Sequence, residues 1–206
     1  GKDIWISFVP GDGGSKGMAE VAKTERGGYL LGFTPPRPLL INPKVVKTPY
    51  ALGDLIPVAQ VGVFYTALVV PAGSRWRTLH DFVDDARKRL EPFTYATGGE
   101  LSLAHLAMEA LSQISGMKLK HAPFDNGPAA VKGVVEGKAD ITMTDVQAQF
   151  GKDGKTRILA IATETRLPGW PEVPTFKELG YDVVFDVWQG IVAHKGTSAE
   201  VVTKVE

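Results

Sequence analysis

The hydrophobic residues of this chain follow two periods in alternation, one typical of strands and the other of helices. Short runs of β-branched and aromatic residues end at glycines, prolines or asparagines, which predict turns. Between these runs, apolar residues recur every three or four positions, most clearly over residues 78–90. Strands are predicted at 4–9, 29–33, 56–63, 66–70, 93–96, 119–122, 139–143, 156–163, 183–187 and 190–193, and helices at 15–24, 78–90, 101–114 and 128–136.

This order of elements predicts an α/β fold with parallel strands. Parallel neighbours need a crossover connection, and a strand–turn–helix unit supplies one. The segment 34–38 is predicted to be an ordered loop, because its prolines cannot continue a helix or a sheet ladder.

Composition excludes several classes of function. The 206 residues include 23 Lys and Arg and 23 Asp and Glu, so the formal charge is zero and no nucleic-acid partner is expected. The absence of cysteine excludes disulfides, zinc–thiolate sites and a cysteine nucleophile. The longest apolar run, 58–72, is interrupted by polar residues and glycine, so no insertion into a membrane is expected. The chain also opens without the basic and apolar segments of a secretion signal.

Neither a metal nor a cofactor is expected from the motifs. The glycines within 11–17 depart from the spacing of a dinucleotide-binding loop. His105 lies in the predicted helix 101–114 and is interpreted as a hydrogen-bonded core residue. The histidines are too scattered along the chain to predict a metal site: His80, His105, His121 and His194.

Residues 13–17 read Gly-Gly-Ser-Lys-Gly, the G-x-S-x-G pattern of a hydrolase nucleophile turn. Histidines follow downstream, so the order serine, acid, histidine is available. A nucleophilic serine of this kind follows several core strands, however, whereas only 14 residues precede Ser15. We therefore interpret Ser15 as a turn residue near a helix start and keep a serine hydrolase as the alternative function.

Three polar turns follow predicted strands, at 95–102, 124–128 and 143–145. In an open α/β sheet the carboxyl ends of strands are where ligands bind. Glycines let a ligand approach the backbone, and the free N–H groups of a helix start suit a carboxylate. Because no catalytic triad or cofactor motif accompanies these turns, they favour non-covalent binding of a small molecule.

Short segments spread over nearly the whole chain carry a family resemblance. Examples are Tyr-Ala-Thr-Gly-Gly at 95–99, His-Ala-Pro-Phe at 121–124 and Pro-Glu-Val-Pro at 171–174. The others are 10–17, 28–32, 41–43, 52–59, 68–71, 102–106, 137–140, 157–162, 175–180 and 188–190. In this order they resemble the extracytoplasmic substrate-binding proteins of tripartite tricarboxylate transporters, the Bug-type solute receptors.

The resemblance implies a two-lobed α/β fold like that of type II periplasmic binding proteins, with open sheets flanked by helices and the ligand between the lobes. Residues 71–188 would form one lobe, and 1–70 plus 189–206 the other. Against the family pattern, the chain lacks the first strand, its glycine-rich loop, the first helix and the closing helices, so the first lobe is expected to be incomplete.

The function implied by the resemblance is that of a periplasmic solute receptor without catalytic activity. It would bind a small organic acid or an amino-acid-like ligand and pass it to the membrane subunits of a transporter. The sensor of a transcription regulator is a further alternative, but it needs a helix-turn-helix that the sequence does not show.

Ligand contacts can be carried over from the family residue by residue. In the loop that follows residue 96, small residues would hold a carboxylate through N–H and hydroxyl groups, while Asp145 would line the cleft opposite. The expected ligand-binding residues are Thr34, Pro35, Thr97, Gly98, Gly99, Glu100, Ser102, Asp125 and Asp145.

Two of these residues depart from the family pattern in charge. Glu100 stands where a neutral residue is usual, and Asp125 where a basic one is common. Together with Asp145 they would place three negative charges near one cleft, which would repel a tricarboxylate. The expected ligand is therefore a zwitterion, an acid that also bears a cation, or a neutral compound, rather than a citrate-like anion.

Overall fold

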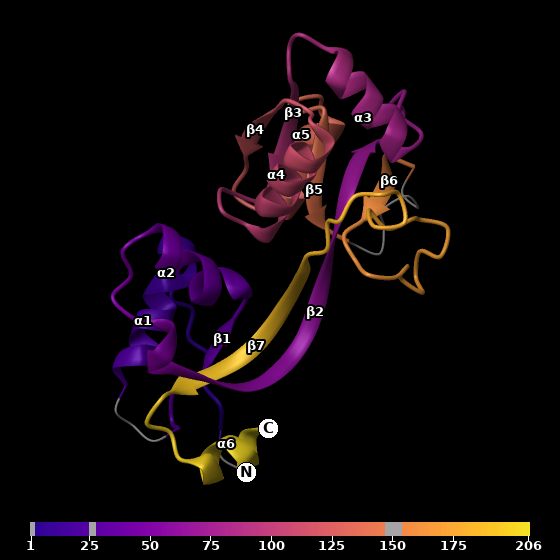
Figure 1. Ribbon diagram of the computed structural model, residues 1–206. Coiled ribbons are helices and arrows are strands. Elements are labelled where there is room, and N and C mark those ends of the chain that lie inside the picture. Colours follow the sequence, from indigo (N-terminus) through magenta and orange to yellow (C-terminus); the bar gives the residue numbers. More distant parts are fainter. Residues whose placement is uncertain (1–2, 25–27, 147–153) are drawn as a thin grey trace. The chain divides into compact units, whose positions relative to one another are not determined.

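Two strands connect the two units into which the chain divides. The computed structural model describes residues 3–24, 28–146 and 154–206; unit 1 comprises 1–63 and 188–206, and unit 2 comprises 64–187. Strand β2 (Leu55–Pro71) passes from unit 1 into unit 2, and β7 (Asp186–His194) passes back (Figure 1).

The sheet of unit 2 combines a parallel centre with antiparallel neighbours. Strand β3 (Phe93–Thr97) lies between β4 (Leu119–Pro123) and β5 (Ile141–Asp145) and is parallel to both. The end of β2 pairs antiparallel with β5 and with β6 (Thr156–Ile161). The predicted α/β class is confirmed, but parallel pairing holds only for β3, β4 and β5. Because β2 enters from unit 1 rather than from a helix of unit 2, no crossover imposes a parallel direction on it.

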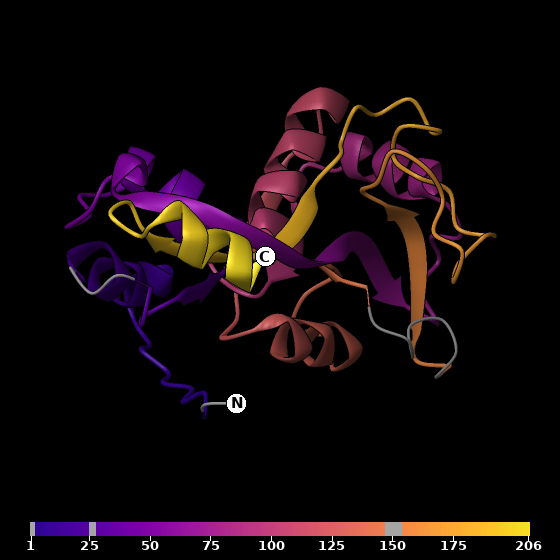
Figure 2. The same ribbon diagram turned by 90° about the horizontal axis from the view of Figure 1, so that it is seen from below.

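Helices cover both faces of this sheet. Helices α3 (Leu79–Lys88) and α4 (Leu103–Ser115) pack on one face, and α5 (Gly127–Val135) lies on the other (Figure 2). Leu68 and Val70 of β2 join the core beneath α3 and α4, whereas Ala67 and Val69 join a different cluster. This alternation is the period of two that a strand buried on both faces requires.

Unit 1 is built on the antiparallel pair of β1 (Gly32–Thr34) and β7, with β2 on the other side of β7. Its core includes Met18, Leu39, Tyr50 and Val192, all buried. The helical elements are the 3-10 turn η1 (Asp12–Gly14), α1 (Ser15–Lys23), the π-helical turn η2 (Arg37–Ile41), α2 (Asn42–Val45), the 3-10 turn η3 (Leu52–Asp54) and α6 (Ala199–Val205).

Two predictions for unit 1 are wrong. Residues 4–9 form no strand, and Ile4, Trp5, Ile6 and Phe8 are 80 to 91% exposed. A β-rich run becomes a strand only beside a strand that pairs with it, and none of the described residues pairs with this run. The expected loop at 34–38 instead leads into η2, because proline is tolerated in the first turn of a helix, where its missing N–H is not needed.

Other differences concern the limits of elements. The strands predicted at 56–63 and 66–70 form the single strand β2, and residues 183–185 lie outside β7. Helix α3 ends at Lys88, so Leu90 falls outside the apolar stripe and is 98% exposed.

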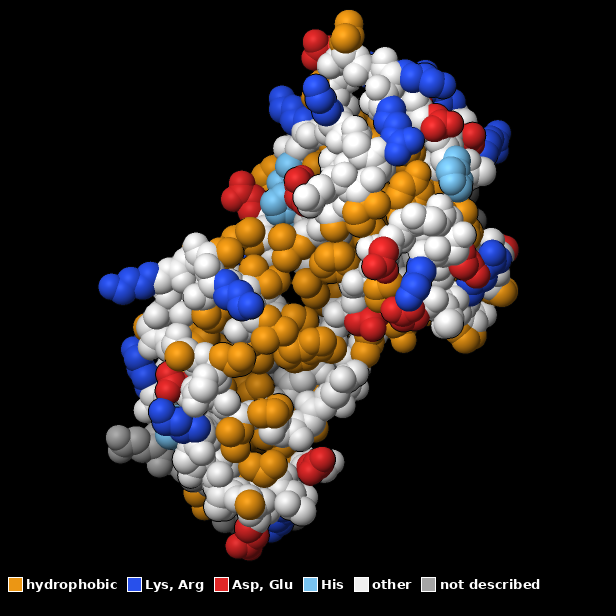
Figure 3. Space-filling model, in the orientation of Figure 1, with side chains coloured by type: hydrophobic (Ala, Val, Ile, Leu, Met, Phe, Trp, Pro, Cys, Tyr) orange, Lys and Arg blue, Asp and Glu red, His pale blue; other side chains and the backbone are white. Residues whose placement is uncertain are grey.

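The surface carries charges of both signs. On the face drawn in Figure 3, basic and acidic side chains are interspersed over both units, in keeping with the balanced charge of the sequence. Among the described residues, every helix is too short or too polar to cross a membrane.

We predict that Phe82→Ala lowers the free energy of unfolding by about 3–5 kcal/mol, since the substitution empties a core position. Phe82 is fully buried in unit 2 and meets the Trp76 ring edge-on, with 5.1 Å between ring centroids. Urea denaturation followed by circular dichroism measures the loss. The matched control is Leu90→Ala, expected to change stability by less than about 0.5 kcal/mol. Equal losses in the two variants would contradict the assigned core.

Candidate functional site

The segments that follow β3 and β4 meet the end of β5 at one edge of the unit 2 sheet; residues 143–145, predicted to be a turn, belong to β5 itself. A Cβ atom on Gly98 would lie 2.7 Å from the backbone nitrogen of Gly127, and one on Gly127 would lie 2.8 Å from Oγ1 of Thr144. Real Cβ atoms do not approach so closely, so glycine is required at position 98 for this backbone contact, whereas at position 127 a Cβ would meet the Thr144 side chain. The edge is formed by the carboxyl ends of parallel strands, the usual ligand-binding position of an α/β sheet.

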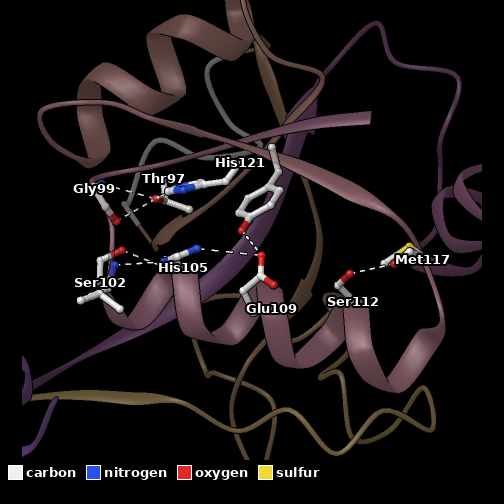
Figure 4. A network of polar contacts seen from close by, with 10 residues as sticks. Thr97, Gly99, Ser102, His105, Glu109, Ser112, Met117 and His121 are labelled. Atoms are coloured by element: carbon white, nitrogen blue, oxygen red, sulfur yellow. Dashed lines mark hydrogen bonds and ion pairs between the residues drawn. The ribbon is translucent and has the colours of Figure 1, made fainter. Parts of the chain in front are cut away.

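Hydrogen bonds fix the start of the loop 97–102. The backbone oxygen of Thr97 accepts from the N–H of Phe124 at 3.0 Å, which joins this loop to the segment after β4. The Thr97 hydroxyl is 2.7 Å from Nε2 of His121 and 3.1 Å from the backbone oxygen of Gly99 (Figure 4). Thr97 itself is fully buried, so its side chain shapes the loop rather than reaching solvent.

The end of the loop is held by a reciprocal cap on helix α4. Ser102 is the N-cap residue, and its hydroxyl accepts from the N–H of His105 at 3.2 Å. In return, Nδ1 of His105 accepts from the N–H of Leu101 at 3.0 Å. Leu101 has a φ of +56°, a left-handed conformation that costs a non-glycine residue roughly 1–2 kcal/mol. The hydrogen bond to His105 offsets part of that cost.

This loop presents the start of α4 toward the edge of the sheet. The first turn of a helix carries N–H groups without partners inside the helix, and the helix dipole adds a partial positive charge there. An anion such as a carboxylate is therefore stabilised at this position.

A cluster of ionisable side chains lies behind the loop. The rings of His105 and His121 are stacked, with centroids 4.1 Å apart and planes inclined by 11°. The Tyr95 ring, on strand β3, stacks on the His121 ring of strand β4, and the Tyr95 hydroxyl donates to the Glu109 carboxylate. Burial and this carboxylate raise the pKa of Tyr95. Burial lowers the pKa of His121, and the nearby His105 lowers it further.

The pairing of His105 with His121 was not predicted from the sequence. His105 is hydrogen-bonded, as predicted, but the sequence pattern predicts no contact between His105 and His121. A possible signal was their place in one strand–helix–strand unit, with one in the first turn of α4 and the other in β4. Parallel pairing of β3 and β4 then brings the two rings to the same side of the sheet.

Acidic residues stand in each of the converging segments. Glu100 lies in the loop 97–102, Asp125 in the segment after β4, and Asp145 at the end of β5; all three are exposed. The Asp145 side chain reaches solvent, yet the surrounding protein desolvates it enough to raise the pKa of its carboxyl group. The charged residues that distinguish this sequence thus belong to the same edge of unit 2.

The remaining expected ligand residues belong to unit 1. Thr34 ends β1 and pairs with Gly190 of β7, and it is almost fully buried. Its hydroxyl donates to the backbone oxygen of Pro35 at 3.0 Å. Pro35 is exposed at the surface of unit 1.

Ser15 has a structural role in unit 1. Its buried hydroxyl accepts from the Asn42 amide at 2.8 Å and lies 3.2 Å from the Tyr50 hydroxyl. Asn42 also donates to the backbone oxygens of Asp12 and Gly13, so it ties η1 to α2. Neither Asn42 nor Tyr50 is a base, and a nucleophilic serine needs one. The G-x-S-x-G pattern therefore reflects a glycine-rich turn, and the hydrolase alternative gains no support.

Within residues 3–24, 28–146 and 154–206, no group of three or more histidine, aspartate or glutamate side chains is placed to hold a metal ion.

Comparison with known proteins relates this chain to a family. Residues 1–206 match the family described as "Tripartite tricarboxylate transporter family receptor". Protein BugT of Bordetella pertussis is 30% identical over 98% of this chain, which covers 64% of BugT. A ligand-free crystal structure of a TctC solute binding protein from Polaromonas is 29% identical, with a TM-score of 0.79, over 94% of this chain and 67% of that protein.

A third similar structure is Rpa4515 of R. palustris with adipate. It is 24% identical, with a TM-score of 0.85, over 95% of this chain and 67% of that protein, and it supports the fold alone. The chain spans less than two thirds of the length of the curated relatives it matches.

We predict that Gly98→Ala lowers the free energy of unfolding by about 1–3 kcal/mol, because the added methyl group forces the two segments apart. Its Cβ would also lie 3.0 Å from the carbonyl carbon of Asn126, so backbone on both sides must move. Gly73→Ala is the matched control, since a Cβ there meets nothing within 4 Å. Urea denaturation of both variants tests this, and a Gly98→Ala protein as stable as Gly73→Ala would contradict the close approach.

Proposed function

This chain belongs to the tripartite tricarboxylate transporter receptor family, and on that premise we propose that it is the solute receptor of a secondary transporter. It binds a small carboxylate-bearing solute in the periplasm and presents it to the membrane subunits of the transporter. No bond of the ligand is made or broken.

The observation that carries this proposal is the loop 97–102 at the start of α4. Glycines at 98 and 99 bring the backbone close to the neighbouring segment and leave little side chain to obstruct a ligand. The helix start offers N–H groups and a positive dipole end to one carboxylate. Such a loop can hold a carboxylate through backbone N–H groups alone, with no bond made or broken.

Lobe closure is the step that would report binding to the transporter. We propose that units 1 and 2 act as the two lobes and that the ligand binds between them, with Thr34 and Pro35 on the side of unit 1. The strands β2 and β7 join the units, so small backbone changes near Val63 and Val187 could serve as the hinge. Ligand contacts on both lobes would favour the closed state over the open one.

The acidic residues narrow the class of ligand. Glu100 and Asp125 stand in the segments that follow β3 and β4, and Asp145 ends β5 at the same edge of the sheet. A ligand with several carboxylates would gain at the helix start but be repelled by these side chains. We propose a ligand whose carboxylate meets the helix start while its other end is neutral or cationic, as in an amino acid. Rpa4515, solved with adipate, is the contrasting case of a dicarboxylate.

Isothermal titration calorimetry with lysine, adipate and citrate tests this proposal. We expect heat from lysine, weaker binding of adipate and no detectable citrate binding, with each ligand recovered unchanged after incubation. Chemical conversion of a ligand would contradict a receptor function. Tight citrate binding without heat from lysine would contradict the proposed ligand class.

The substitution Glu100→Gln tests separately whether the acidic side chains repel a ligand with two carboxylates. Removal of this exposed charge should raise the affinity for adipate by up to about fivefold, the range of a surface charge interaction. Glu172→Gln is the matched control, because Glu172 is also exposed in unit 2 but lies outside the converging segments. An equal effect of both substitutions would show that Glu100 acts only through net charge.

A further inference from the structure

His105 bonds back to the loop that precedes its own helix. The N–H of Leu101 donates to Nδ1 of His105 at 3.0 Å. A backbone N–H is always a donor, so Nδ1 must be the acceptor and the neutral ring carries its proton on Nε2. The geometry therefore selects one of the two neutral tautomers.

The arrangement is a variant of the capping box. In the common form, the N-cap side chain accepts from the backbone N–H at the third helical position, and a glutamate there reaches back to the N-cap N–H. Here Ser102 accepts from the N–H of His105 at 3.2 Å, and His105 reaches one residue further back, to Leu101. A glutamate keeps its acceptor over most of the pH range, whereas a histidine loses its acceptor when it is protonated.

The groups around His105 would accommodate a proton on this ring. Nε2 lies 3.9 Å from the Glu109 carboxylate on the same helix, close enough for an ion pair once the ring is charged. From β4, His121 stacks on the ring at 4.1 Å, and burial, followed by the nearby His105, lowers the pKa of His121, while Glu100 and Glu109 act in the opposite direction. Tyr95 of β3 lies 6.2 Å away and donates to Glu109, and Glu100 adds a negative charge from the loop.

We propose that His105 is a positioning residue for the ligand loop and that it acts only in its neutral form. A proton taken up from solvent at Nδ1 would face the N–H of Leu101, so the hydrogen bond breaks and two donors oppose each other. Leu101, with a φ of +56°, then loses the contact that supports its left-handed conformation. The loop 97–102 then leaves its binding conformation, and affinity falls in the protonated protein.

The effect on the loop does not depend on the ligand; only the effect on affinity rests on the proposed function. NMR hydrogen exchange of the ligand-free protein at pH 7.5 and 5.5 tests the effect on the loop. We expect the protection factor of the Leu101 amide to fall about tenfold at the lower pH, as for one lost hydrogen bond. His105→Leu should be unprotected at both values. His105→Asn places an amide oxygen near the position of Nδ1 and should stay protected at both.

His80→Asn is the matched control, since it removes a histidine of the same unit on helix α3. It should behave like the unmodified protein. Unchanged Leu101 protection in His105→Leu, or protection that does not change with pH in the unmodified protein, would overturn the proposal. If His105→Leu fails to fold, the nitrogen-15 chemical shifts of the His105 ring in the unmodified protein test the proposal, because they show which ring nitrogen carries the proton. A proton on Nδ1 at pH 7.5 overturns the proposal, and an unprotonated Nδ1 supports it.

Calorimetric titration with adipate at both pH values tests the link to binding. We expect about a tenfold weaker affinity at pH 5.5 for the unmodified protein and for His80→Asn. Adipate itself takes up protons between the two pH values, and this contribution to the affinity change remains in His105→Asn. The affinity change of His105→Asn, expected to be smaller, therefore serves as the baseline. The same pH dependence in His105→Asn would overturn the role in affinity. If adipate binds at neither pH, adipate is not a ligand and that part of the proposed function fails, while the Leu101 exchange data still decide the role of His105.

Discussion

The close contact between the backbones at Gly98 and Gly127 is the constraint on which the candidate site depends. It exists because β3 and β4 run parallel and release their following segments at the same edge of the sheet. A side chain at position 98 would hold these two segments apart, and one at position 127 would meet the Thr144 hydroxyl. The contact sets where α4 begins, and with it the position of the N–H groups that can meet a carboxylate.

Behind this edge, polar side chains hold the loop in place. The two capping bonds between residues 101, 102 and 105 join the loop to its own helix, and Thr97 joins it to β4 through His121. These contacts run from the loop into a cluster that includes the buried Tyr95 and the carboxylate of Glu109. The loop 97–102 is therefore coupled to ionisable groups that lie behind it.

Predictions from sequence succeeded where local patterns decide the structure. The helices α1, α3, α4 and α5 and most strands of unit 2 were found within a few residues, since periodic apolar positions and caps specify them. These predictions failed where contacts with another segment of the chain decide the local structure. Residues 4–9 have the composition of a strand but no pairing strand among the described residues, and the prolines of 34–38 are accommodated at the start of η2.

The sequence by itself determined the α/β class, the family and the turns that follow β3 and β4, because these depend on residue order and local pattern. Only the tertiary structure decided what individual polar side chains do. Ser15 proved to be the acceptor for Asn42, and His105 and His121 proved to be stacked partners. Such contacts join residues distant in the chain, and their geometry follows from the packing of strands and helices, which no local pattern records.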